Sequence, residues 1–332
     1  MGEHFDKALI FTDLHIVPEG ETIIGLDPLA RFSEGLAHAL SRHPDAQHII
    51  LLGDLTHNGA PEEYARLAPA LADCPIPISV TTGNHDLRDN LTAVFPNALD
   101  RDGFVQRALD LGPLRLLILD TFDYDGAAPM EHDGYLCATR LAWLDDELAR
   151  AAKDGKDVVV FCHHPPCPTG FWAMDAIGLA NADALLSRLH AAPHVRHLVC
   201  GHIHRTIHAS AGGLPVSILK SPCHQIPMIL GQGTFQDSID EPGAYGILLA
   251  LKDTVVLHTE DFALSNLEGY VNDSGQRAVE LRQALNFNQL PDSSLPCLFY
   301  GGKTGRQPKG HTYKFPKKTP NFEPETTGRL KK

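Results

Sequence analysis

Five short polar motifs, each following directly on a run of apolar residues, constrain this chain more than any other feature. They combine carboxylate, amide and imidazole side chains with glycine or proline: Asp13-Leu14-His15, Gly53-Asp54 with Gly59 after it, Gly83-Asn84-His85-Asp86, His163-His164-Pro165-Pro166 and Gly201-His202-Ile203-His204. Short apolar runs bounded by turn residues are typical of buried strands. Strand ends that carry oxygen and nitrogen ligands predict the edge of a sheet that holds metal.

Strands and helices alternate in the first part of the chain. Apolar patterning predicts strands at 8–11, 48–52 and 76–80 and amphipathic helices at 29–40 and 61–72. Pro61 occupies the first position of the second helix, where proline is favoured. This βαβαβ order predicts an α/β fold with a parallel sheet and helices on its faces. The ligands of such sheets collect at the carboxyl ends of the strands, where the motifs lie.

Strands and helices also follow one another in the middle of the chain. Helices are predicted at 90–95, at 139–152 with Thr139 as its cap, and at 182–189, and strands at 104–109, 114–119, 158–161, 197–199, 205–209, 216–219, 245–251 and 255–259. The Leu-Gly-Pro turn before residue 114 predicts an antiparallel pair. Residues 165–181 are rich in proline and glycine, and we expect them to form a loop or lid over the site.

The composition changes near residue 260, which predicts a catalytic domain over 1–260 and an extension over 261–332. The extension is expected to hold one amphipathic helix at 274–285 and then a basic, mobile tail that cannot bury a core. Residues 301–332 carry nine Lys or Arg and two acids, whereas the whole chain has a formal net charge of −13. Such an acidic balance argues against general nucleic-acid binding.

Cysteine usage and hydropathy favour the cytoplasm. The seven cysteines are scattered without a Cys-x-x-Cys pair, which disfavours a disulfide framework or a zinc knuckle and favours reduced thiols. No window approaches the roughly 18 apolar residues that a membrane span requires. Residues 1–7 do not form a basic-then-apolar signal region. We therefore expect a cytoplasmic protein without a membrane span.

The polar motifs favour a binuclear metal site. A single Asp or His after a strand is usually a cap or turn residue. Asp13 and His15, however, alternate with period two, which points both side chains to one face, and His202 and His204 repeat this spacing. So many polar groups at one strand edge are costly without cations. Imidazole, carboxylate and amide ligands without thiolate suit manganese, iron or zinc, and the sequence does not choose among them.

The order of the motifs resembles that of the calcineurin-like metallophosphoesterase superfamily. The family set of Asp-x-His, Gly-Asp with a later glycine, Gly-Asn-His-Asp, a histidine after a strand and Gly-His-x-His occurs here in family order. The resemblance implies a four-layer αββα sandwich of two mixed β-sheets flanked by helices. It also implies one metal held by Asp13, His15, Asp54 and His204, and a second held by Asp54, Asn84, His163 and His202.

The same resemblance implies a mechanism. A hydroxide bridging the two ions would attack phosphorus in line, and His85 would protonate, or donate a hydrogen bond to, the departing alkoxide. Asn84 and His85 are expected to contact the substrate phosphate. Asp86 is expected to orient the His85 imidazole, and Arg88 either contacts phosphate or pairs with Asp86.

Within the superfamily the chain is most similar to class III cyclic nucleotide phosphodiesterases and to glycerophosphodiesterases. It shares their Gly-Asp-Leu-Thr…Asn-Gly run at 53–59, their His-His-Pro-Pro start and their segment at 174–181. Purple acid phosphatases have a metal-binding tyrosine where this chain has His57, which we expect to face either the pocket or solvent.

These features predict a dinuclear-metal phosphodiesterase for small diesters, with 3′,5′-cyclic AMP as the first candidate and a homodimer implied by the resemblance. Phe171, Trp172 and Met174 either offer a face to the base or pack the loop against its own helix. The alternatives are a glycerophosphodiesterase, a broad phosphodiester and phosphonate monoester hydrolase, or a phosphomonoesterase. A metal-free binding scaffold is disfavoured because all seven predicted ligands are present.

Overall fold

The computed structural model describes residues 5–130, 132–231 and 237–262. The helix predicted at 274–285, the basic tail and nearly all of the extension predicted over 261–332 lie outside these described residues. Within the described part of the chain, no helix has both the length and the apolar character that crossing a membrane requires.

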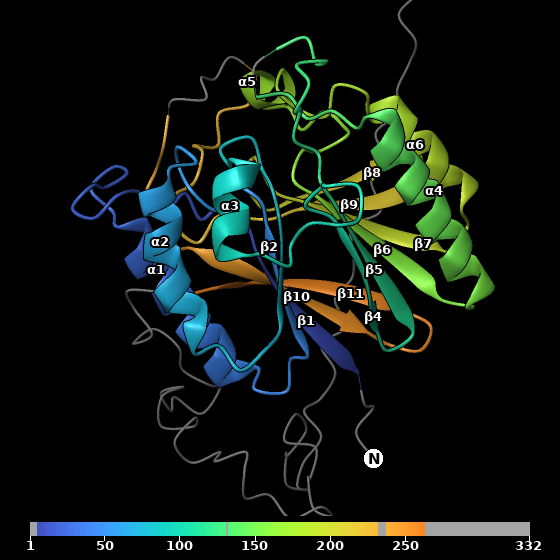
Figure 1. Ribbon diagram of the computed structural model, residues 1–332, viewed down its shortest axis with the longest axis horizontal. Helices are drawn as coiled ribbons and strands as arrows, with labels where there is room; N and C mark the ends of the chain where they lie inside the picture. Colours follow the sequence, from blue (N-terminus) through green and yellow to red (C-terminus); the bar gives the residue numbers. More distant parts are fainter. Residues whose placement is uncertain (1–4, 131, 232–236, 263–332) are drawn as a thin grey trace, which may run out of the picture. The chain divides into compact units, whose positions relative to one another are not determined.

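Two mixed β-sheets form the centre of the fold (Figure 1). In the first sheet, the three strands predicted at the start of the chain run parallel, and two strands from the end of the described region extend the sheet with antiparallel pairing. The order across this sheet is β11 (Val255–Asp261), β10 (Ala244–Ala250), β1 (Asp6–Phe11), β2 (His48–Leu52) and β3 (Ile78–Thr81).

The second sheet has a parallel centre and antiparallel edges. Its order is β4 (Arg107–Leu111), β5 (Leu114–Leu119), β6 (Asp157–Cys162), β7 (Val195–Cys200), β9 (Leu214–Ile218) and β8 (Ile207–Ala211). The β4–β5 hairpin confirms the predicted antiparallel pair.

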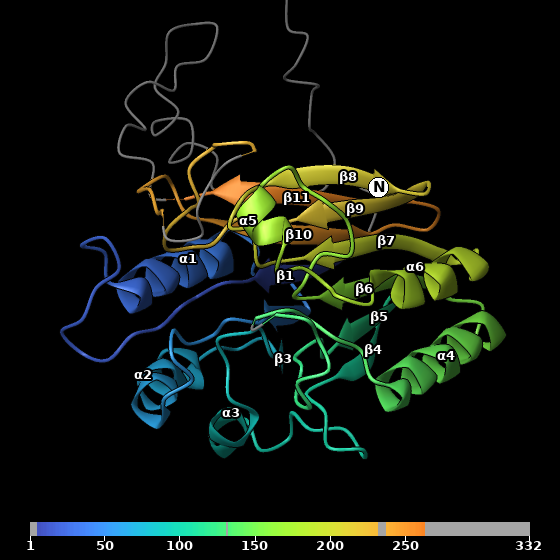
Figure 2. The ribbon, with the colours of Figure 1, turned by 90° about the horizontal axis from the view of Figure 1, so that it is seen from above.

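Helices cover the outer face of each sheet (Figure 2). On the first sheet lie α1 (Pro28–Arg42), α2 (Pro61–Ala72) and α3 (Arg88–Val94), and on the second lie α4 (Ala138–Lys153) and α6 (Ala182–Ala191). The short helix α5 (Trp172–Asp175) lies within the predicted lid segment. The four layers confirm the predicted αββα sandwich of two mixed sheets.

Strand β1 shows how one continuously apolar strand contributes to two of the hydrophobic cores. All of its residues from Ala8 to Phe11 are buried. Leu9 and Phe11 pack with the helices of the first sheet, whereas Ala8 and Ile10 pack between the two sheets. Because side chains alternate across a strand, a continuously apolar strand serves two cores at once.

Three predicted boundaries differ from the structure for identifiable reasons. Strand β3 begins at Ile78, because Pro77 has no N–H to donate to a neighbouring strand. Strand β4 begins later than predicted, because the N–H groups of Phe104 and Val105 donate to aspartate carboxylates rather than to a strand. Helix α4 is capped at Cys137, so Thr139 lies within its first turn.

Leu116 tests the core between the sheets, where its side chain is fully buried. We expect Leu116→Ala to lower the free energy of unfolding by about 2–5 kcal/mol, because it removes buried methyl groups and leaves a cavity. Leu99→Ala is the matched control, because this leucine is 41% exposed. Urea unfolding of both variants measures the difference, and equal small losses would contradict the assigned inter-sheet core.

Candidate metal centre

The polar motifs meet at the carboxyl ends of strands from both sheets. Asp13 follows β1, Asp54 follows β2 and Asn84 follows β3, while His163 and His202 follow β6 and β7. The backbone N–H of His202 donates to the Asp13 carboxylate at 3.0 Å, which joins the turn after β7 to the turn after β1. Residues far apart in the sequence are therefore brought to one edge of the sandwich.

The backbone at this edge is strained at the predicted ligands. Five of the seven have positive φ angles: Asp13 (58°), His15 (48°), Asp54 (49°), His202 (72°) and His204 (50°). Positive φ is uncommon for residues other than glycine, and each such conformation costs on the order of 1–3 kcal/mol. Strain of this kind is concentrated where side chains must be held in a fixed direction for function.

The ligand atoms predicted for the first metal converge. The Nε2 atoms of His15 and His204 lie 3.0 Å apart. Asp13 Oδ1 lies 3.4 Å from His204 Nε2, and Asp54 Oδ2 lies 3.5 Å from His15 Nε2. Asp54 Oδ2 also lies 3.3 Å from Nε2 of His163, which belongs to the second predicted set. The carboxylate of Asp54 thus stands between the two sets, as a bridging ligand requires.

The second set contains three buried atoms that lack a hydrogen-bond partner among the described residues. They are Asn84 Oδ1, His163 Nε2 and His202 Nε2. Nδ1 of His163 lies 3.0 Å from the carbonyl oxygen of Leu52, so this nitrogen donates its proton and Nε2 is the nitrogen left to bind a metal. Unpaired buried acceptors are costly, and metal coordination would satisfy all three. The residues present therefore fit a metal site.

Burial and charge set the protonation of these groups. Burial lowers the pKa of His202 to about 3 and that of His15 well below its usual value, which keeps both imidazoles neutral and able to bind metal. At His163 burial also disfavours the charged form, but the carboxylates of Asp54 and Asp13 outweigh it and raise the pKa to about 10, so a metal ion that binds Nε2 would displace a proton. The two carboxylates therefore attract positive charge to this point.

Two glycines of the motifs allow the ligands to approach the backbone. A Cβ atom at Gly83 would collide with Asp54 Oδ1. A Cβ atom at Gly201 would collide with Thr12 Oγ1 and lie close to the Asp13 carboxylate. These positions require glycine because a ligand or its neighbour occupies the space that a side chain would fill.

His85 is held beside the two ligand sets. Its backbone N–H donates to Asp54 Oδ1 at 2.8 Å, and its ring Nδ1 lies 2.7 Å from the carbonyl oxygen of His57. That carbonyl can only accept, so Nδ1 carries a proton and donates it. Nε2 is the ring nitrogen left to exchange a proton with a bound molecule.

The structure corrects the predicted role of Asp86. Its buried carboxylate accepts hydrogen bonds from the backbone N–H groups of Leu55 and Gly83 and from the hydroxyl of Tyr64, and none from the His85 ring. Burial, followed by the nearby charge of Asp54, raises the pKa of Asp86 to about 6. Asp86 therefore ties the turns after β2 and β3 together instead of orienting the imidazole.

Arg88 has partners other than Asp86. Its guanidinium donates to the carbonyl of Gly103 and lies 4.3 Å from the centre of the Tyr124 ring. It does not pair with Asp86, whose partners are given above, and it is not one of the described residues that line the site.

A cavity of ≈ 660 Å³ opens over the candidate metal centre. Met174 lines this cavity, whereas Phe171 is buried in the core against the second sheet and Trp172 is 62% exposed. Phe171 therefore packs into the core and does not line this cavity. The lining is mostly histidine and aliphatic: His15, Ile23, Ile24, Asp54, His57, Asn84, His85, Met130, His132, Met174, Ile177, His202, His204, His224, Ile226 and Ser238.

Three histidines of this lining were not predicted to belong to the site or were left undecided. His57 and His132 stack on the His85 ring, with centroid distances of 5.4 Å and 5.6 Å and interplanar angles of 19° and 14°. His132 Nδ1 also lies 3.3 Å from Nδ2 of Asn84. The ring of His224 lies 4.7 Å from that of His204. His132 and His224 belong to no motif, so tertiary contacts alone reveal them.

Comparisons with known proteins agree with this geometry. The calcineurin-like phosphoesterase family matches residues 7–206. A probable cyclic nucleotide phosphodiesterase of Rhodopseudomonas palustris is 36% identical over 258 residues, which cover 77% of this chain and 92% of that protein. A 3′,5′-cyclic adenosine monophosphate phosphodiesterase of Pseudomonas aeruginosa is 29% identical over 225 residues, covering 68% of this chain and 78% of its own length.

A solved structure supports the fold. The dimetal phosphatase from Danio rerio superposes with a TM-score of 0.60 at 17% identity, over 77% of this chain and 96% of that one. The predicted enzyme class, a metal-dependent phosphodiester hydrolase, is confirmed together with the superfamily. The strand-end ligands, the αββα sandwich and the matched sequence lead to one conclusion: this chain belongs to the calcineurin-like phosphoesterase family.

Proposed function

We propose that the protein is a dinuclear-metal phosphodiesterase that hydrolyses small phosphodiesters, with 3′,5′-cyclic AMP as its first candidate substrate. The observation that carries the metal centre is the position of Asp54 between two groups of ligand atoms, one of which includes three buried atoms without hydrogen bonds among the described residues. The cyclic nucleotide rests on similarity to proteins that carry this activity in their names.

In this proposal the ligands divide into two sets. Asp13, His15, Asp54 and His204 would hold one transition-metal ion, and Asp54, Asn84, His163 and His202 would hold the other. Manganese, iron and zinc all suit these ligands. When bound, such a pair supplies a nucleophile at neutral pH and neutralises charge on the phosphate oxygens.

In this proposal His85 donates a proton to the leaving oxygen of the substrate. Its Nδ1 proton is donated to the His57 carbonyl, so the proton for the departing oxygen is a second one, which Nε2 carries in the imidazolium form of the ring. The stacked rings of His57 and His132 restrict rotation of the imidazole. The buried aliphatic lining near Met174 and Ile177 limits the water around that proton.

We also propose that the protein is cytoplasmic and forms a homodimer. The described cysteines are free thiols, which fits a reducing compartment such as the cytoplasm. The homodimer rests on the family resemblance.

A panel of three substrates tests the proposed function. Chelator-treated protein supplied again with Mn²⁺ should hydrolyse bis(4-nitrophenyl) phosphate and 3′,5′-cyclic AMP faster than 4-nitrophenyl phosphate, because the proposed site serves diesters, and His85 can protonate the alkoxide that leaves from cyclic AMP. Diester hydrolysis without cyclic AMP turnover would move the substrate to glycerophosphodiesters or phosphonates. A clear preference for the monoester would refute the diesterase proposal.

A substitution at Asp54 tests whether this carboxylate serves both metal positions. We expect Asp54→Ala to lose both metal ions together and to reduce kcat by about 10³-fold or more, because the carboxylate serves both positions. Elemental analysis after buffer exchange measures the metal content, and Asp125→Ala, an exposed aspartate, is the control. Retention of a full equivalent of metal with normal turnover would rule out the bridging assignment.

His85 tests the proton transfer. His85→Ala should keep its metal content but slow cyclic AMP, with its alkoxide leaving group, about 10²–10⁴-fold. The nitrophenyl diester should be slowed much less, because nitrophenolate departs without a proton. His258→Ala, an exposed histidine of β11, is the control. Equal losses on both substrates would argue against the acid role of His85.

A further inference from the structure

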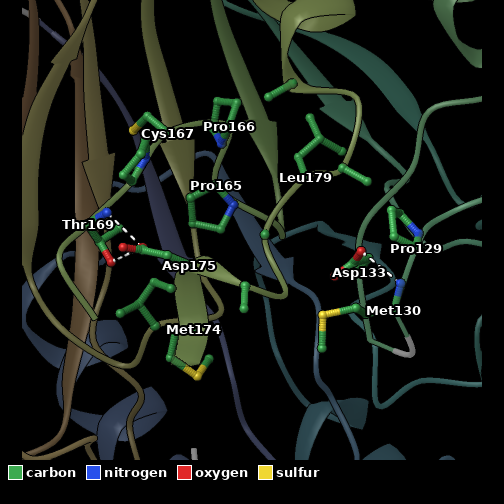
Figure 3. Close-up of a pocket in the computed structure, with 16 residues that line it drawn as sticks. Pro129, Met130, Asp133, Pro165, Pro166, Cys167, Thr169, Met174, Asp175 and Leu179 are labelled. Atoms are coloured by element: carbon green, nitrogen blue, oxygen red, sulfur yellow. Dashed lines mark hydrogen bonds between the residues drawn. The ribbon is translucent and has the colours of Figure 1, made fainter. Parts of the chain in front are cut away.

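A second pocket of ≈ 350 Å³ adjoins the catalytic cavity (Figure 3). Its walls are largely apolar and come from the segment at 165–181 and from the loop before α4. Pro165, Pro166 and Leu179 contribute flat or aliphatic surfaces. Met130 and Met174 line both this pocket and the catalytic cavity. A single molecule can therefore contact both spaces across these two side chains.

The pocket is built from the same turns that carry the predicted metal ligands. Pro165 and Pro166 directly follow the motif of His163. Ile203, another lining residue, lies between His202 and His204. A phosphodiester held at the metal centre therefore has this pocket as a neighbouring recess for its organic group.

One buried acceptor in the pocket lacks a partner. Asp133 is 7% exposed, and its Oδ2 accepts a hydrogen bond from the N–H of Met130 at 3.1 Å, as drawn in Figure 3. Its Oδ1 is buried and has no hydrogen-bond partner among the described residues. Leaving such an acceptor unsatisfied is unfavourable, and a ligand with a matching donor would remove that cost.

The other acid of the pocket differs from Asp133. Asp175 accepts from the N–H groups of Thr169 and Gly170 and from the Thr169 hydroxyl, so its carboxylate serves to close the loop. Of the two acids that line the pocket, Asp133 is the one with an acceptor available to a ligand. A pocket with apolar walls and one carboxylate acceptor suits a flat ring that bears an N–H donor.

We propose that this pocket binds the base of an amino-substituted purine nucleotide, with Asp133 Oδ1 accepting a hydrogen bond from the 6-amino group. The inference rests on the proposed function, because the phosphate of the same molecule would lie at the metal centre. The hydrogen bond to Asp133 would let the protein discriminate between diesters that carry different bases. A 6-oxo purine would present an acceptor to the carboxylate oxygen, and two acceptors repel each other.

Asp133→Asn provides a sharp test, because the substitution nearly preserves shape. The N–H of Met130 must still be accepted by the amide oxygen, so the amide NH₂ would face the pocket. The variant should then prefer a 6-oxo base. Binding of AMP and IMP to Mn²⁺-loaded protein is measured by calorimetry, which does not require turnover.

The unmodified protein should bind AMP about 10–100-fold more tightly than IMP, since a hydrogen bond to a charged group contributes about 1.5–3 kcal/mol. In Asp133→Asn this ratio should fall at least tenfold or reverse. An unchanged far-UV circular dichroism spectrum and melting temperature would show that the variant is folded. Asp125→Ala, an exposed aspartate of the same loop, should leave the binding ratio and these folding measurements unchanged.

A second comparison avoids substitution altogether. In the unmodified protein, purine riboside 5′-monophosphate, which lacks any group at position 6, should bind more weakly than AMP and more tightly than IMP. Equal affinities for the three nucleotides, or an unchanged ratio in Asp133→Asn, would overturn the assignment of the pocket. Failure to hydrolyse any diester would instead overturn the proposed function, while the ratio of AMP to IMP binding would still decide the assignment of Asp133.

Discussion

The structure depends on a cluster of carboxylates and imidazoles buried between the ends of two sheets. Asp13 and Asp54 are almost fully buried, and so is His163 beside them. Burying this many polar groups is unfavourable unless they are compensated. Hydrogen bonds from the backbone satisfy some of the oxygen atoms, while lone pairs on Asn84 and His163 remain unsatisfied among the described residues. Cations at this position would supply the missing compensation, so the fold and the metal-dependent chemistry of the family would share one physical origin.

The strain in the turns is a consequence of the same requirement. Ligands such as Asp13 and Asp54 must leave their strands abruptly and point back over the sheet edge, and positive φ angles achieve this. Glycine at 83 gives the Asp54 carboxylate room. Three packed cores, made by the apolar strands and their helices, hold these turns in place. The stability of the sandwich is thus used to maintain local conformations that isolated turns would not adopt.

Prediction from the sequence succeeded where the signal is local and failed where it is not. The strands, the hairpin and the strand-end motifs have periodicity or turn chemistry that can be recognised in a few residues. The partners that Asp86 and Arg88 have in the structure could not be predicted, because they lie on segments that are distant in the sequence. His132 and His224 were missed because no short pattern marks them, although both line the cavity.

The sequence by itself determined the layered α/β fold, the family and the residues able to bind metal, since alternating apolar runs and ligand-bearing turns are readable along the chain. Only the tertiary structure decided which atoms converge, which histidines surround His85, and that Asp133 has an unpaired oxygen in a pocket beside the catalytic cavity. The physical reason is that backbone periodicity is a local property. The direction and partners of a buried polar side chain depend instead on segments that folding brings together from distant parts of the chain.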